Sequence, residues 1–399
     1  MRRKTGKKGT EMARHSRGAA AHLAFGLLFL LAGIPPLVRG FLEAPCREFA
    51  PPAPVRPRGP DDARPFLRED FVDAEKLTQF AHCPAVVEMG DGDLMAVWYA
   101  GIEEGSSDVA LYRADWSRRS GRWSTPCLLT DVAGTRADLG RYIRKIGNAV
   151  LHRDDRGRIW LFYVSVSAGG WSGSALNVKV SEDDGRDWSR ARRLVTCPIF
   201  NMGTLVRCGA VRYRDGSMGL PVYHELIGKF GALLRLGPDG APLDESRISW
   251  GRASLQPSVV PLDGSRAVAF LRQSGMPERR ILRSRSADGG RSWSPLELLP
   301  LPNPDSAVSA LRADDGTLWL AYNMLEYDRD TLGLARSRDG GERWDEVHEF
   351  VRGEKEDETV GFSYPFMIEA SDGIFHVLYS WNRERIRHVR FNRAWLEAL

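Results

Sequence analysis

The strongest constraint on the fold is a short motif that returns along the chain, Ser-x-Asp-x-Gly-x-x-Trp. Asp, Ser and Gly close tight turns, through side-chain hydrogen bonds to the backbone and through positive φ. The last two copies begin 51 residues apart and the first two 105 apart, so one unit between them lacks the motif. We expect a structural turn whose tryptophan fills the gap between neighbouring sheets. The copies are "SEDDGRDW" (181–188), "SADGGRSW" (286–293) and "SRDGGERW" (337–344).

A looser copy, "ADWSRRSGRW", covers 114–123, and "LGPDGAP" at 236–242 falls where the missing copy should be. A second repeat has a small residue or Pro, three or four β-forming residues, a Gly turn and then an alternating or aromatic strand. Six such units with no sustained helical period predict an all-β fold, a six-bladed β-propeller over residues 66–399. The units begin with 82–92, 147–157, 207–216, 255–264, 305–316 and 364–373.

The N-terminal part differs in composition. Residues 1–18 carry seven basic residues and one acidic residue, so the net charge of +4 leaves −2 for residues 19–399. A near-neutral body does not indicate a nucleic-acid binder. The apolar run 19–38, "AAAHLAFGLLFLLAGIPPLV", is about as long as the roughly 20 residues of a transmembrane helix.

The basic flank predicts a cytoplasmic tail (1–18), followed by a single-pass signal anchor (19–38) in the inner membrane. The Pro-rich segment 39–65 is then an extended linker, and the propeller lies on the periplasmic side. A cleaved signal peptide, which would make the protein secreted, is the alternative.

The cysteine and histidine patterns predict no metal site and no cofactor. An odd number of cysteines at irregular spacing forms neither a disulfide framework nor a zinc site. No His/Asp/Glu cluster has metal-ligand spacing, and no Gly-rich phosphate loop follows a predicted strand. The cysteines are Cys46, Cys83, Cys127, Cys197 and Cys208.

The first strand of each propeller blade lines the central channel, so the residue at its leading end points at one shared funnel. A cavity with a few converging polar groups is the usual form of a small-molecule site. Blade by blade the candidates are His82, Lys145 or Asn148, Arg207, Gln256, Asp305 and Tyr364.

A six-bladed propeller with these turn motifs resembles the sialidase (neuraminidase) superfamily, over roughly residues 66–395. Retaining sialidases use a tyrosine nucleophile in place of a carboxylate. The resemblance implies that this tyrosine opens the last blade, and "SYPFMIEASDGIFHVLYSW" (363–381) places Tyr364 there. A phenol needs a neighbouring base or a positive field before it can attack.

The resemblance also implies an arginine that binds the substrate carboxylate, and "QPSVVPLDGSRAVAFLR" (256–272) places Arg272 there. It further implies an acidic residue in the loop after the second strand of the first blade. That loop offers Glu103, Glu104 and Asp108. Glu104 is the first choice for the general acid, and Asp108 either binds substrate or caps the next strand.

The chain departs from the superfamily pattern at three positions. His82 or Cys83 stands where the first arginine is expected. Asn303 and Asp305 stand near the expected third arginine. Gln256, which cannot take up a proton, replaces the glutamate that activates the tyrosine.

Other residues are candidates to compensate for these departures. Arg207 and Arg144 offer positive charge from other blades. In "YHE" (223–225), Glu225 offers the missing base and His224 a substrate contact.

These observations predict an exo-acting glycoside hydrolase that removes a terminal acidic, sialic-acid-like sugar from a glycan or glycoconjugate. Tyr364 would attack the anomeric carbon, Glu104 would protonate the leaving oxygen, and Arg272 would hold the anionic group. The alternative is a non-catalytic glycan-binding or scaffold propeller that has lost part of the arginine triad.

Overall fold

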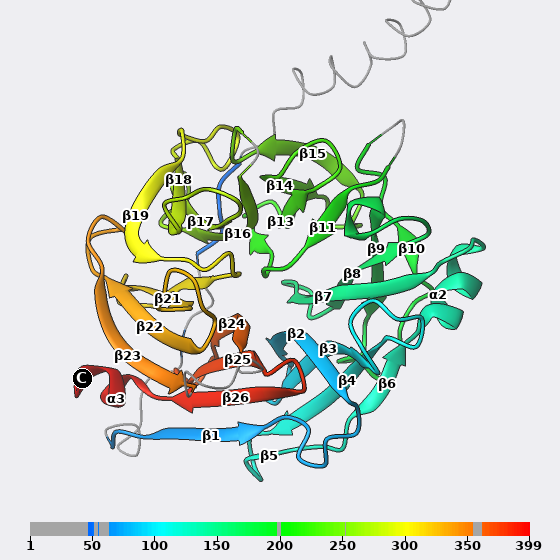
Figure 1. Ribbon diagram of the computed structural model, residues 1–399, viewed down its shortest axis with the longest axis horizontal. Helices are drawn as coiled ribbons and strands as arrows, with labels where there is room; N and C mark the ends of the chain where they lie inside the picture. The colour runs from blue at the N-terminus through cyan, green and yellow to red at the C-terminus, as the bar shows by residue number, and fades with distance from the viewer. Residues whose placement is uncertain (1–46, 52–54, 56–63, 198–200, 252, 354–360) are drawn as a thin grey trace, which may run out of the picture. The chain divides into compact units, whose positions relative to one another are not determined.

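In a computed structural model of the protein, the repeated segments form six antiparallel sheets around a central axis (Figure 1). The predicted basic tail and transmembrane helix lie outside the described residues. Within the part of the chain that the structure describes, no helix is long and apolar enough to span a bilayer. The structure describes residues 47–51, 55, 64–197, 201–251, 253–353 and 361–399.

Each sheet is one blade, with its first strand at the channel and its later strands farther out. The first blade comprises β2 (Phe80–Glu88), β3 (Leu94–Gly101), β4 (Ala110–Ser117), β5 (Arg122–Trp123) and β6 (Cys127–Thr130). The second comprises β7 (Lys145–Arg153), β8 (Ile159–Val166), β9 (Ser174–Ser181) and β10 (Arg192–Arg193). The third comprises β11 (Thr204–Val206), β12 (Val211–Arg212), β13 (Met218–His224), β14 (Phe230–Leu236) and β15 (Pro242–Arg247). The fourth blade comprises β16 (Ser254–Pro261), β17 (Ala267–Gln273), β18 (Arg280–Ser286) and β19 (Glu297–Pro302). The fifth comprises β20 (Ser309–Arg312), β21 (Leu318–Tyr322), β22 (Thr331–Ser337) and β23 (Asp345–Arg352). The sixth comprises β24 (Phe362–Glu369), β25 (Phe375–Trp381), β26 (Arg385–Phe391) and β1 (Leu67–Phe71).

The prediction of an all-β, six-bladed propeller is therefore confirmed. The sequence analysis did not anticipate how the ring closes. Strand β1 pairs antiparallel with β26, with Leu67 opposite Phe391 and Phe71 opposite Arg387. The last blade thus takes its outer strand from the N-terminal side of the propeller.

The described residues include two short α-helices and a 3-10 turn at Trp171–Gly173, although no helical period predicts them. Helix α2 (Val132–Leu139) begins at Asp131, whose side chain accepts a hydrogen bond from the Gly134 amide at 2.6 Å. It ends at Gly140, which adopts the left-handed conformation typical of a C-cap. Helix α3 (Arg393–Glu397) follows the last strand.

The turn motifs fold as the sequence predicts. In the first copy the Ser181 hydroxyl accepts the Gly185 amide at 2.7 Å, and the Asp183 carboxylate accepts the Asp187 amide at 2.9 Å. The Trp188 indole N–H donates to the Gly185 carbonyl at 3.0 Å. The motif therefore satisfies its own polar groups, which fits a structural role.

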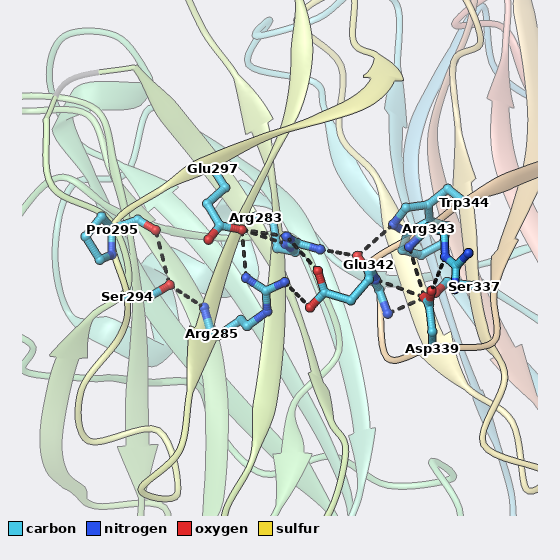
Figure 2. Close-up of polar contacts among 11 residues, drawn as sticks. Arg283, Arg285, Ser294, Pro295, Glu297, Ser337, Asp339, Glu342, Arg343 and Trp344 are labelled. Carbon is cyan, nitrogen blue, oxygen red and sulfur yellow. Dashed lines mark hydrogen bonds and ion pairs between the residues drawn. The ribbon is translucent and has the colours of Figure 1, made fainter.

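The motifs also join neighbouring blades, as Figure 2 shows for the fourth and fifth. Arg283 and Arg285 of β18 lie between Glu297 of β19 and Glu342 in the turn of the next blade (Figure 2). Arg283 is within 2.5 Å of Glu297 and also donates to the carbonyl of Gly341. The Arg283 side chain is only 9% exposed, whereas its partners Glu297 and Glu342 are 47% and 56% exposed, so the arginine is buried and the carboxylates reach solvent.

Part of the segment predicted as a linker packs onto the propeller. Phe49 is buried, stacks on Tyr213 at a centroid distance of 4.9 Å, and donates its amide to the Gly264 carbonyl at 2.8 Å. Arg47 pairs with Asp244 at 2.8 Å. Residues 47–51 therefore belong structurally to the third and fourth blades.

Candidate active site

Five blades share an unusual backbone feature at the start of their channel-lining strands. One residue in each has φ between 46° and 57°, a region that non-glycine residues rarely adopt. In four of the five, strand pairing shifts register at this point, which is the mark of a β-bulge. Such strain collects at functional sites. The residues are Cys83, Asn148, Gln256, Asp305 and Tyr364.

Arg272 draws three of these side chains together. Its Nη1 donates to the Tyr364 hydroxyl at 2.9 Å and to the Gln256 side-chain oxygen at 3.1 Å. Its Nε donates to the Asp305 carboxylate at 2.6 Å. The structure thus unites four predicted residues from the fourth, fifth and sixth blades at one end of the channel.

Tyr223 extends this group toward the second blade. Its hydroxyl accepts hydrogen bonds from Asn148 at 2.9 Å and from Gln256 at 3.3 Å. Burial raises the pKa of Tyr223 well above its ordinary value, so its phenol stays neutral. The sequence analysis gave Tyr223 no role, because nothing in a strand sequence separates a site tyrosine from a packing one.

Arg207 lies beneath Tyr364 rather than at the surface of the site. Its side chain is 1% exposed, and its guanidinium carbon is 5.3 Å from the centre of the Tyr364 ring. It donates to the backbone carbonyls of Pro84 at 3.2 Å and Pro365 at 3.1 Å, and to that of Tyr364. Arg207 therefore ties the first, third and sixth blades together and adds a buried positive charge under the tyrosine.

Arg329 is a site residue that the sequence analysis missed. It lies in the loop between β21 and β22, donates to the Asp305 backbone carbonyl, and has its guanidinium carbon 5.9 Å from the Tyr364 ring centre. The sequence pattern pointed to the start of the fifth blade, near Asn303 and Asp305, for a third arginine. Arg329 reaches the same place from the loop after the second strand of that blade.

His82 and Cys83 occupy the place of the expected first arginine. His82 is buried, with Nδ1 2.8 Å from the Ser380 hydroxyl and its ring 4.6 Å from that of Tyr364. Burial, assisted by Arg383 and other arginines, lowers the pKa of His82 well below its usual value. Burial raises the pKa of the Cys83 thiol to about 12. Both groups are therefore neutral at physiological pH.

Two glutamates border the site. Glu104, with a side chain 34% exposed, accepts from the Tyr99 hydroxyl at 3.5 Å and lies 3.4 Å from Arg383. Burial raises the pKa of Glu225 above its ordinary value, although Lys229 and Arg272 oppose the shift. A carboxyl group with a raised pKa suits proton transfer near neutral pH.

Three predicted residues are not brought into this group. Asp108 accepts the Ile102 amide at 2.7 Å and so holds its own loop. His224 points away, with Nε2 3.1 Å from Glu245 on the outer strand of its blade. Arg144 is exposed, and its amide donates to a backbone carbonyl of β8.

The second blade offered two candidates, and the structure separates them. Asn148 occupies the strained bulge position and joins the hydrogen-bonded group. Lys145 instead lies with its ammonium 4.0 Å from the ring centre of Trp171.

A cavity of about 440 Å³ lies at the opposite end of the channel. Its lining comes from the trailing ends of the first strands and from Ala50, Pro51 and Val55. It shares no residue with the group around Tyr364. Among the described residues, no cluster of three or more His, Cys, Asp or Glu side chains is arranged to hold a metal ion.

The fold has counterparts among known structures. The propeller is similar to the NanB sialidase of Streptococcus pneumoniae (11% identity, 80% of this chain and 69% of that chain, TM-score 0.62). It is also similar to the intramolecular trans-sialidase of Ruminococcus gnavus (14% identity, 82% and 97%, TM-score 0.65). A protein of unknown function from Dyadobacter fermentans is similar to the same degree (15% identity, 82% and 99%, TM-score 0.65).

At these identities the similarity concerns the fold. No curated protein sequence matches the chain significantly. The family described as BNR repeat-like domain matches residues 92–377, which is most of the propeller. The expected resemblance to the sialidase-like superfamily with BNR repeats is thereby confirmed. From its sequence and its fold, the chain belongs to the BNR repeat-like domain family.

Proposed function

We propose that the protein is an exo-acting, retaining glycoside hydrolase in which Tyr364 is the nucleophile. One observation carries the proposal: the Tyr364 hydroxyl accepts a hydrogen bond from Arg272 at 2.9 Å while its backbone has φ of 57°. A bulky residue keeps such a conformation only where its surroundings enforce it, at a cost of about 1–3 kcal/mol. A packing tyrosine needs neither the strain nor the cation.

The charges around Tyr364 favour its reaction as a phenolate. Arg272 contacts the oxygen, and the guanidinium carbons of Arg207 and Arg329 lie 5.3 and 5.9 Å from the ring centre. A positive field stabilises the anionic form of a nucleophile. Glu225, whose charge acts on Arg272, is the carboxylate proposed to accept the phenolic proton.

In the first step, the Tyr364 oxygen bonds to the anomeric carbon and the bond from that carbon to the leaving oxygen breaks. Glu104 gives its proton to the leaving oxygen, and Glu225 accepts the phenolic proton. In the second step, water attacks the anomeric carbon, loses a proton to Glu104 and displaces Tyr364, which regains its proton from Glu225. Two displacements retain the anomeric configuration.

A second function, glycan binding without catalysis, is favoured by Gln256. Its side-chain oxygen accepts from the same Arg272 nitrogen that contacts Tyr364, and an amide cannot take up a proton. If Glu225 does not act as the base, the site binds a sugar and leaves its glycosidic bond intact.

The test is hydrolysis of a panel of fluorogenic glycosides by the full-length chain and by Tyr364→Phe. We expect the variant to lose at least about 1000-fold in kcat, as for loss of a covalent nucleophile. Tyr322→Phe is the matched control, because it removes a phenol that bonds Glu346 at 2.8 Å in the fifth blade. Full activity in Tyr364→Phe would exclude the nucleophile, and wild-type glycan binding without turnover would establish the binding function.

A further inference from the structure

We propose that the sugar accepted by this site carries no carboxylate, because Asp305 already fills the position at Arg272 where a substrate carboxylate would bind. The proposal rests on the proposed glycosidase function and names its substrate class. The sequence predicts an acidic sugar, whereas the contacts of Arg272 in the structure favour a neutral one.

An arginine binds a carboxylate best along one edge of its guanidinium, with two parallel hydrogen bonds. One edge consists of Nε and Nη2, and the other of Nη1 and Nη2. On the first edge Nε is bonded to Asp305 at 2.6 Å. On the second edge Nη1 is bonded to Tyr364 at 2.9 Å and to Gln256 at 3.1 Å. Neither edge of Arg272 can therefore receive a second carboxylate without losing a contact.

The two other arginines near Tyr364 do not supply a substitute. Arg207 is buried and directs its terminal nitrogens to backbone carbonyls of the first and sixth blades. Arg329 donates to the Asp305 backbone carbonyl, so it lies beside the same internal carboxylate. Arg207 is thus held by three backbone carbonyls, and Arg329 is held through one nitrogen beside Asp305.

Asp305 itself faces the place where a ligand would lie. Its side chain is 31% exposed, compared with 14% for Arg272, so an entering ligand reaches the carboxylate first. Its φ of 56° fixes the direction of the side chain. A carboxylate on the ligand would meet this negative charge at short range, and like charges repel there.

The remaining polar groups are suited to hydroxyls. The Asp305–Arg272 pair places an acceptor beside a donor. Behind this pair, Asn148, Gln256, His82 and Tyr223 are at most 7% exposed and hydrogen-bonded within the protein, and all four both donate and accept without net charge. This set matches a terminal sugar with neutral substituents, namely a hexose, a deoxyhexose or an N-acetylhexosamine.

The experiment compares the full-length wild type with Asp305→Asn. Asparagine keeps the shape, tolerates the left-handed backbone and removes the charge. Asp184→Asn is the matched control, because Asp184 also has φ of 56° but lies in the turn motif of the second blade. Two readouts are taken: the rate on neutral and acidic 4-methylumbelliferyl glycosides, and the binding of free N-acetylneuraminic acid by calorimetry.

We expect the wild type to hydrolyse a neutral glycoside and not the sialoside. Asp305→Asn should bind N-acetylneuraminic acid at least about tenfold more tightly than the wild type and Asp184→Asn. Preferential hydrolysis of the sialoside by the wild type would overturn the substrate class and leave the glycosidase function standing. If no glycoside is hydrolysed, the glycosidase function is wrong. The affinity for N-acetylneuraminic acid then decides whether the site accepts a sugar with a carboxylate. Equal affinity of the wild type and Asp305→Asn for N-acetylneuraminic acid would overturn the proposed substrate class.

Discussion

Tyr364 has a backbone conformation that its own side chain disfavours, and several contacts enforce it. Arg272 bonds its hydroxyl, and Arg207 bonds its carbonyl and lies under its ring. His82 packs against the other ring edge at 4.6 Å. At this scale the site is a strained residue restrained by residues of three other blades, which keeps the phenol in one orientation for reaction.

The raised pKa of Glu225 leads to a prediction about pH. Below that pKa the carboxyl is protonated and cannot accept the phenolic proton, so kcat/KM should fall on the acid side, with a midpoint above the ordinary value of 4.5 for Glu. Glu225→Gln should lower kcat/KM at every pH and abolish this acid limb. Glu245→Gln, on the outer strand of the same blade, should leave the profile unchanged. If the acid limb persists unchanged in Glu225→Gln, another titrating group is responsible for it.

The residues that the sequence identified and those it missed differ in one respect. Gln256, Asp305 and Tyr364, and Asn148 as one of two candidates, lie near the leading ends of channel-lining strands, so the repeat period pointed to them. Tyr223 lies on β13 of the third blade, and its long side chain brings the hydroxyl into the site, where it accepts a hydrogen bond from Asn148. Its position depends on packing between blades, which a repeat pattern does not encode.

The elements of this fold are joined by their turns. Arg113 of the first blade donates to the carbonyl of Gly185, and Arg283 of the fourth blade donates to that of Gly341. In both cases the acceptor is the glycine of the turn motif in the following blade. The motif thus supplies a carbonyl that a neighbouring arginine satisfies. This contact gives the motif a structural role, although the motif is not part of the candidate site.

Arg283→Met should destabilise the joint shown in Figure 2. It removes the Arg283 donor from Glu297 and from the Gly341 carbonyl, which keep Arg285 and the Trp344 indole as partners, so we expect a loss of roughly 1–2 kcal/mol, or a few degrees in Tm. Arg343→Met is the control, because that side chain is 92% exposed and an exposed ion pair contributes little. Thermal unfolding by circular dichroism measures both, and equal melting temperatures for the two variants would show that the joint carries no stability.

Over the whole molecule, the period of about 50 residues was enough to predict the class and the number of blades. It could not predict that "LREDF" of β1 closes the ring, because three of its five residues are charged and its pattern matches no repeat. Nor could it show that Phe49 docks between blades, since the Pro-rich composition around it is typical of a linker. Both are contacts between segments far apart in the chain.

The buried histidines predict how the stability of the whole propeller depends on pH. Burial lowers the pKa of His152 to about 4 and that of His376 to about 3, and the pKa of His388 also lies well below its usual value. The unfolded chain binds protons near pH 6.5 that the folded chain cannot, so the stability present above that pH is lost as the pH falls. At pH 5 the loss is roughly 2 kcal/mol for each such histidine.

We therefore expect Tm to fall between pH 7.5 and pH 5. His376→Gln should reduce the slope, because glutamine retains an acceptor for the His388 ring N–H, 2.9 Å away, and does not titrate. Differential scanning calorimetry at several pH values measures this, and an identical slope in the variant would refute the assignment to His376.

The closure of the ring by β1 has a consequence for biosynthesis. Strand β1 leaves the ribosome early, but its partner, β26, begins only at Arg385. At roughly 5–20 residues per second, β1 waits on the order of 15 to 60 s before that partner exists. Throughout that interval the nascent chain exposes an unpaired edge at each end of a growing arc, so cellular factors that shield strand edges have their largest effect before translation ends.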